Sequence, residues 1–143
     1  MIICDTHCDT LYMRALQPNK TPCVTMDAMK KGGMSLQTCT LYAGNQGMAG
    51  HPYDKAMAEY HAFEHLRDAE GWERVNSPLE AEDGKVKILL SVEGGEIFEG
   101  KVERVHEFYG YGVRMAALTW NNENEIGHSA KSGSQEGIKP RGW

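Results

Sequence analysis

The sequence predicts an α/β protein in which the strands run parallel and alternate with helices. Segments typical of strands and of helices follow one another along the chain. Residues 86–92, V-K-I-L-L-S-V, form a nearly continuous apolar run, as expected of a parallel strand that is buried on both faces. The 16 glycines, several of them in pairs, supply the tight turns that such an alternation needs. Right-handed crossovers and a parallel sheet follow from this order of elements.

The expected elements can be assigned from apolar patterns and turn signals. We expect strands at residues 1–9, 34–43, 86–92 and 113–119, and a short extended piece at 72–76. We expect helices at residues 26–31 behind a Thr25 cap, 53–70 ended by Gly71, 78–83 after Ser77, and 96–109. A single helical turn is expected near 11–16, a loop over 44–52 and a polar segment over 120–143. The two longer helices should bury apolar faces, formed by Ala56, Tyr60, Phe63 and Leu66 and by Phe98, Val102, Val105 and Tyr109.

Composition limits the classes of function. A net charge of −5 argues against nucleic acid as the main partner, because phosphate binding needs a basic face. No run approaches the ~18 apolar residues of a membrane helix, and the apolar start is too short for a signal peptide. The four cysteines lack C-x-x-C spacing, so we expect reduced thiols, a structural role for them and a cytoplasmic protein.

The length of 143 residues predicts one domain over residues 1–143. The sequence leaves open whether residues 121–143 are an ordered part of that domain or a mobile tail.

The first candidate site lies in C-D-T-H-C-D-T, residues 4–10, at the end of the first expected strand. Side chains alternate along a strand, so His7 and Asp9 should point to one face and Cys8 to the other. An imidazole and a carboxylate two residues apart form half of a site for a divalent metal. By itself the pair also fits an ordinary strand end, where a histidine is simply hydrogen-bonded.

The second candidate is Glu93, which follows the apolar strand directly and precedes Gly94 and Gly95. It should therefore lie at the carboxyl edge of the sheet, where parallel α/β folds bind their ligands. A glycine pair between strand and helix can also cradle a phosphate, but Glu93, Glu96 and Glu99 would repel an anion. A carboxylate that only stabilises the start of the next helix is the remaining alternative.

A third pattern, His61-Ala62-Phe63-Glu64-His65, matches the H-x-x-E-H arrangement of a zinc peptidase helix. Two histidines one turn apart would bind the ion, and Glu64 would be the general base. On the helical wheel, His61 and Glu64 fall on the side away from Phe63. A crossover helix turns that side to water, so this peptidase is the less favoured enzyme hypothesis.

In order along the chain, these pieces resemble the amino-terminal part of the renal (membrane) dipeptidase family. The segments that carry the resemblance are D-T-H-C-D with Leu11, the stretch from Gly32-Gly33 to Gln37, G-K-V through S-V-E-G-G (84–95), Y-G-V-R (111–114), L-T-W-N (118–121) with Asn124, and Gly137-Ile138 to Gly142. They cover the whole chain with similar gaps. The resemblance implies about four β/α units from the amino-terminal portion of a TIM-like (β/α)₈ metal-dependent hydrolase barrel.

The resemblance also implies a binuclear zinc dipeptidase. His7 and Asp9 would bind one ion, and Glu93 would bridge to a second about 3.5–4 Å away. A metal-activated water would then hydrolyse a dipeptide, often one with a D-residue at its carboxyl end. Trp120 and Asn121 are the candidate substrate-binding residues, although some relatives carry a histidine where Trp120 stands. No catalytic residue can be assigned beyond the metal ligands.

This chain departs from the family pattern because it stops early. The family's histidines for the second metal, its carboxylate-binding arginine and its late catalytic aspartate would all lie beyond Trp143. A complete barrel needs roughly 200 residues or more. We therefore expect a fragment of a longer protein or a homo-oligomer that covers the incomplete barrel, with weak or no activity in the chain alone. A truncated assembly or binding module without catalysis is the alternative outside the enzyme class.

Overall fold

The computed structural model describes residues 1–43 and 50–142, so most of the loop expected over 44–52 lies outside the described residues. Its sheet is entirely parallel, with strands β1 (Cys4–Asp5), β2 (Leu36–Tyr42), β4 (Lys87–Glu93) and β3 (Glu73–Arg74) in that order. Strand β5 (Val113–Ala117) also pairs with β4, beside its second half. The predicted α/β class and parallel sheet are confirmed.

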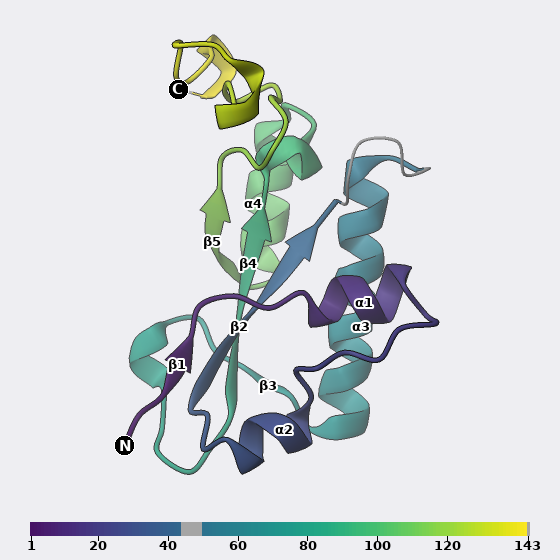
Figure 1. Cartoon of the computed structure of the whole chain (residues 1–143), viewed down its shortest axis with the longest axis vertical. Coiled ribbons are helices and arrows are strands. Elements are labelled where there is room, and N and C mark those ends of the chain that lie inside the picture. Colours follow the sequence, from purple (N-terminus) through teal and green to yellow (C-terminus); the bar gives the residue numbers. More distant parts are fainter. Residues whose placement is uncertain (44–49, 143) are drawn as a thin grey trace.

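Strands β2 and β4 form the centre of this sheet (Figure 1). They pair without interruption over seven positions, from Leu36 opposite Lys87 to Tyr42 opposite Glu93. Strand β3 pairs only with the start of β4, and β5 only with its end. The outer edges of β1 and β5 have no partner strand among the described residues.

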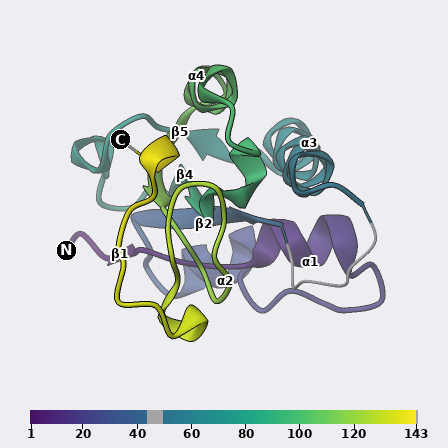
Figure 2. The same cartoon turned by 90° about the horizontal axis from the view of Figure 1, so that it is seen from above.

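One face of the sheet, called the outer face, is covered by helices, and the opposite face is called the inner face. The hydrophobic core on the outer face, the outer core, includes residues of α1 (Thr10–Leu16), α2 (Met26–Lys31), α3 (Pro52–Glu70) and α4 (Val102–Gly110). Figure 2 shows α1, α3 and α4 around this face, with the carboxyl-terminal segment crossing above the strands. The core is formed by alternate β2 and β4 residues packed against helix side chains, namely Cys39, Leu41, Ile88, Leu90, Val92, Leu11, Met29, Phe63 and Phe108. No helix in the described part of the chain combines the length and apolar character needed to cross a membrane.

Several expected elements are confirmed with small shifts of boundary. Helix α2 begins behind Thr25, whose hydroxyl accepts the Ala28 N–H, and α3 ends at Gly71 in the left-handed conformation. The expected apolar face of α3 is buried. The piece expected at 78–83 is a single 3₁₀ turn over Pro78–Glu80, because Ala81 is already extended.

The first strand is much shorter than predicted. Only Cys4–Asp5 pairs with β2, although residues 1–9 were expected to be extended. The Asp5 carboxylate accepts the backbone N–H of His7 at 3.0 Å, which forms a local turn. This bond gives the His7 N–H a partner within its own segment, so the chain leaves the sheet before it reaches α1.

The helix predicted at residues 96–109 is broken, and most of its predicted apolar face is wrong. A 3₁₀ helix over Gly95–Phe98 is separated from α4 by Glu99 and Gly100, both with positive φ. The break resets the helical phase, so that Phe108 becomes the buried residue of α4. The other predicted residues of this helix face outward, since Val102, Val105 and Tyr109 are 62%, 44% and 61% exposed.

Residues 118–142 carry short turns instead of a long element. They contain 3₁₀ turns at Ala130–Ser132 and Pro140–Gly142 and an antiparallel bridge between Gly127 and Ile138. In Figure 1 this segment lies beyond the carboxyl ends of β4 and β5. It therefore sits at the edge of the sheet where the candidate site residues are found.

A fully buried carboxyl group ties α3 to the end of β2. Glu59 has no exposed surface, and its Oε2 accepts the backbone N–H of Tyr42 at 2.8 Å. Its Oε1 has no hydrogen-bond partner among the described residues. Burial raises the pKa of Glu59 well above its ordinary value, because removal from water disfavours the charged form of a carboxyl group.

We predict that Glu59→Gln flattens the pH dependence of stability. An acid whose pKa is higher in the folded protein stabilises folding fully at low pH and loses that contribution as pH rises above the unfolded pKa. One such group changes stability by about 1.4 kcal/mol per pH unit within that window. The variant keeps an acceptor for Tyr42 and should exceed wild type in stability at pH 8 but not at pH 4.

Urea unfolding between pH 4 and pH 8 measures this difference. Glu103→Gln, the same change on the exposed surface of α4, is the matched control and should leave the pH slope unaltered. Parallel pH profiles for wild type and Glu59→Gln would contradict a raised pKa for the buried Glu59.

Candidate metal centre

The turn after β1 presents His7 and Asp9 to solvent and buries the residue between them. The His7 and Asp9 side chains are 47% and 51% exposed. Cys8 is buried in the core, where its Sγ lies 3.5 Å from the Sγ of Cys39. The alternation expected for a strand therefore persists, although Asp5 has already ended the strand.

Glu93 is the last residue of β4 and pairs in register with Tyr42 of β2. The neighbouring β4 side chain, Val92, belongs to the outer core, so alternation places Glu93 on the inner face of the sheet. Burial raises the pKa of Glu93, the neighbouring His7 ring lowers it, and the Asp9 carboxylate adds a smaller upward contribution. Two acids close together in this way are stabilised by a cation between them.

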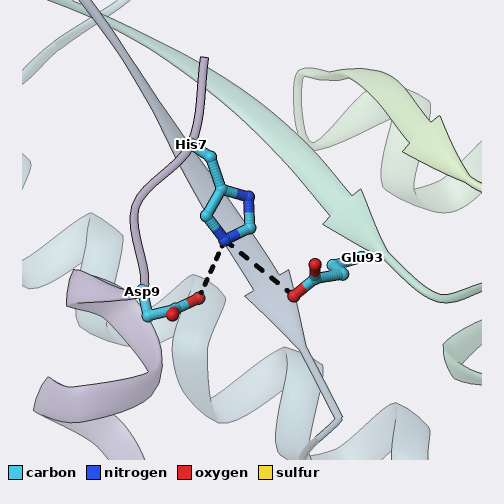
Figure 3. A group of neighbouring side chains, drawn as sticks. All are labelled: His7, Asp9 and Glu93. Carbon is cyan, nitrogen blue, oxygen red and sulfur yellow. Dashed lines mark ion pairs between the residues drawn. The ribbon is translucent and has the colours of Figure 1, made fainter. Parts of the chain in front are cut away.

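The fold brings these three side chains to one point (Figure 3). His7 Nε2 lies 3.3 Å from Asp9 Oδ1 and 3.9 Å from Glu93 Oε2. One ligand atom from each residue lies within 4.8 Å of the other two, and within residues 1–43 and 50–142 this is the group of histidine, cysteine and acidic residues that is close enough to hold a metal. One imidazole nitrogen and two carboxylate oxygens form a donor set that zinc and similar divalent ions accept. The residues present fit such an ion.

The H-x-x-E-H pattern does not form a site in this structure. His61 and His65 are exposed on the outer side of α3, away from the sheet. His61 Nδ1 lies 3.2 Å from Glu64 Oε2, within hydrogen-bond distance, which is an ordinary contact between residues three apart on a helix. The hypothesis of a helix-borne peptidase site is not favoured, because this helix packs as a crossover helix and its polar side faces water.

Trp120 lies near the centre through aromatic contacts. Strand β5 ends at Ala117, two residues earlier than expected, and Trp120 follows it in the chain. Its ring packs edge-on against Tyr42 with centroids 4.9 Å apart, and Tyr42 in turn packs against Tyr12 at 5.5 Å. Burial and the neighbouring Glu93 raise the pKa of Tyr42 strongly. The three rings form an aromatic wall beside the carboxylates.

Asn121 and the chain after it are held by a hydrogen-bond network. The Asn121 carbonyl accepts from Ser129 Oγ at 2.8 Å. The centre of the network is Asn124, whose side-chain nitrogen donates to Glu96 Oε2 at 3.1 Å and to the Leu118 carbonyl at 2.8 Å. Its side-chain oxygen accepts two backbone N–H groups, from Ile126 and Gly127.

Comparison with known proteins places this arrangement in a family. A family model described as membrane dipeptidase, peptidase family M19, matches residues 1–142. The chain belongs to the membrane dipeptidase family. A search of curated proteins found no match. The resemblance predicted from the sequence motifs is thus confirmed.

Solved structures of metallopeptidases and dipeptidases share the fold of this chain. A dipeptidase AC of family M19 superposes with a TM-score of 0.80 at 17% identity, covering 99% of this chain and 53% of that one. A Rhodobacter sphaeroides metallopeptidase, liganded with a phosphinate mimic of the dipeptide L-Ala-D-Ala, gives 0.84 at 17% identity, covering 99% and 54%. The probable dipeptidase PvdM of Pseudomonas aeruginosa gives 0.73 at 16% identity, covering 99% and 42%.

The chain therefore spans about half the length of the membrane dipeptidases that it matches. Its sheet corresponds to part of their fold, which agrees with the expected partial barrel.

We predict that Asn124→Ala loosens the segment that carries Trp120. The change removes four hydrogen bonds and leaves buried backbone groups without partners, so we expect a loss of about 2–3 kcal/mol in the free energy of unfolding. Urea unfolding measures the loss, and limited proteolysis should show faster cleavage after Leu118.

Asn122→Ala is the matched control, since it is the same change two residues earlier and should stay within about 0.5 kcal/mol of wild type. Equal stability and equal cleavage rates for the two variants would show that the Asn124 network does not order this segment.

Proposed function

We propose that this chain is the metal-binding half of a zinc-dependent dipeptidase. The observation that carries the proposal is the convergence of His7, Asp9 and Glu93 at the carboxyl edge of the sheet, in a chain of the membrane dipeptidase family. This edge is the functional side of parallel α/β folds. The supporting chemistry is the donor set, which offers one neutral nitrogen and two anionic oxygens.

In this proposal His7 and Asp9 hold one divalent ion, and Glu93 is shared between that ion and a second one. A divalent ion supplies Lewis-acid chemistry, which acidifies water and polarises a peptide carbonyl. Glu93 suits a bridging position because it projects from the inner face of β4 and is only 26% exposed. Burial strengthens the interaction of a carboxylate with a cation.

The proposed substrate is a dipeptide. The Rhodobacter sphaeroides metallopeptidase binds a mimic of L-Ala-D-Ala, and its fold matches nearly the whole of this chain. Trp120 and Asn121 would contact the substrate, since the Trp120 ring lies against Tyr42, the register neighbour of Glu93. The aromatic wall would exclude water from one side of the bound peptide.

The proposed enzyme needs more surface than this chain supplies. Among residues 1–43 and 50–142, no strand pairs with the outer edge of β5. Met115 of β5 and Leu118 after it are 45% and 48% exposed, and the outward residues of α4, Val102, Val105 and Tyr109, are 62%, 44% and 61% exposed. A cavity of about 180 Å³ lies between β5 and α4, lined by Phe98, Val105, Phe108, Tyr109, Val113 and Met115. We propose that a second copy covers this surface in solution, because an open apolar edge favours association.

We predict that the chain binds one zinc ion per molecule through His7, Asp9 and Glu93. His7→Ala and Glu93→Gln should each weaken zinc binding at least tenfold, because each removes one of three donors. Isothermal titration calorimetry at pH 7.5 measures the affinity. The double variant His61→Ala/His65→Ala is the control and should bind zinc like wild type. A loss of zinc binding in that variant would instead support the H-x-x-E-H site on α3.

We predict that the isolated chain hydrolyses dipeptides far more slowly than the Rhodobacter sphaeroides relative does in parallel assays with zinc and L-Ala-D-Ala. A fusion of residues 1–142 to the remaining half of that relative should regain zinc-dependent hydrolysis, and Glu93→Gln should abolish it. A folded, zinc-loaded fusion without activity would contradict the dipeptidase proposal.

Light scattering on the isolated chain measures its mass in solution and tests the proposed second copy. We expect the mass of a dimer, and the mass of a monomer would contradict the second copy.

A further inference from the structure

The two ring nitrogens of His7 face different surroundings. Nε2 lies toward the Asp9 and Glu93 carboxylates, at 3.3 and 3.9 Å. Nδ1 lies 3.2 Å from the hydroxyl oxygen of Thr40, inside the sheet. One nitrogen therefore points into the metal centre, and the other is hydrogen-bonded to the scaffold.

Thr40 is a buried residue of β2, with 1% of its surface exposed. Its hydroxyl also lies 2.9 Å from the hydroxyl of Ser91, its register partner on β4. A hydrogen-bonded line thus runs from the His7 ring through Thr40 to Ser91. It joins the turn after β1 to both central strands of the sheet.

The donor and acceptor roles along this line follow from the chemistry of a metal-binding histidine. If Nε2 is to offer its lone pair to a cation, the ring proton of neutral His7 must be on Nδ1. Nδ1–H then donates to Thr40 Oγ1, and the Thr40 hydroxyl hydrogen turns to Ser91 Oγ. The hydroxyl hydrogen of Ser91 can point into an adjoining cavity of about 260 Å³, which Thr40 and Ser91 both line.

The competing tautomer carries the proton on Nε2, where it can donate to Asp9 Oδ1. A threonine hydroxyl is both donor and acceptor, so Thr40 can bond to Nδ1 in either tautomer. A side chain without a hydroxyl would leave Nδ1 unpaired, and only the Nε2–H form would then be hydrogen-bonded. The loss removes one hydrogen bond from each tautomer, but it leaves an N–H donor unpaired only in the Nδ1–H form, which is the form that binds metal. An unpaired buried N–H is less tolerated than an unpaired acceptor, so loss of the Thr40 hydroxyl disfavours that tautomer.

The backbone of Thr40 holds the same turn by a second bond. Its N–H donates to the carbonyl of Cys8 at 3.1 Å, next to His7. Side-chain variants keep this bond, so they separate the role of the hydroxyl from the attachment of the turn to β2.

We propose that Thr40, supported by Ser91, is a positioning residue that sets the tautomer and the ring orientation of His7 for metal binding. The consequence for zinc affinity rests on the metal site under Proposed function. The tautomer itself does not, because it can be measured in the metal-free protein.

Four variants test the proposal. Thr40→Val removes the hydroxyl at nearly constant shape, and Thr40→Ser keeps it. Ser91→Ala removes the outer member of the line. Thr38→Val is the matched control, because Thr38 is equally buried on the same strand and face, two residues from Thr40. Thermal unfolding shows whether each variant is folded before it is compared.

The first readout is two-bond ¹H–¹⁵N NMR of the His7 ring in the metal-free protein at pH 8.5. Wild type, Thr40→Ser and Thr38→Val should show a measurable Nδ1–H population, and Thr40→Val should shift to Nε2–H. Identical tautomer populations in wild type and Thr40→Val would overturn the proposal, whether or not the protein binds zinc.

The second readout is zinc affinity measured by competition with a chelating dye. Thr40→Val should bind 10–100-fold more weakly, Ser91→Ala should bind more weakly by a smaller factor, and Thr40→Ser and Thr38→Val should stay within about threefold of wild type. Equal affinities for wild type and Thr40→Val, or an equal loss in Thr38→Val, would also overturn the proposal. The two readouts can also disagree. If Thr40→Val shifts the His7 tautomer but the wild-type protein binds no zinc, the proposed function is refuted and the role of Thr40 stands.

Discussion

The continuous pairing of β2 with β4 determines the geometry of the whole site. Their register fixes which side chains meet on the inner face, with Thr40 opposite Ser91 and Tyr42 opposite Glu93. A slip of one residue would turn the inner residues outward and place Cys39 and Leu41 inside. The outer core opposes such a slip, because those two residues are fully buried against the helices. Packing on one face of the sheet thus maintains the positions of polar groups on the other.

The sequence could indicate those parts of the fold whose signals are local. Residues 86–92 are recognisable as a buried strand because seven consecutive residues are almost all apolar, and α3 because its apolar period continues to Gly71. The short β1 and the broken helix before α4 depend on less visible features. Nothing in M-I-I-C-D-T-H-C-D shows that Asp5 will bond to the backbone of His7, and Glu99 is an uncommon residue for a left-handed conformation.

The same distinction applies to the site. His7 and Asp9 are close in sequence and Glu93 follows an obvious strand, so the three could be proposed together from the pattern and the family resemblance. Thr40 could not, because threonine is an ordinary strand residue and its partners lie 33 and 51 positions away. Only the folded structure shows that its hydroxyl meets the His7 ring. Residues that hydrogen-bond to a candidate metal ligand are therefore harder to find from one sequence than the candidate ligands themselves.

The open edge of the sheet and the metal centre are physically connected. Glu93 pairs in register with Ala117 of β5, and no strand in the described part of the chain pairs with the far edge of β5. A further parallel strand added there would end close to Glu93, because the carboxyl ends of neighbouring parallel strands meet at one edge. In the proposed binuclear site, such a strand could supply ligands for the second ion. The exposed apolar residues of β5 and α4 lie where an added strand would extend both the core and the proposed metal site.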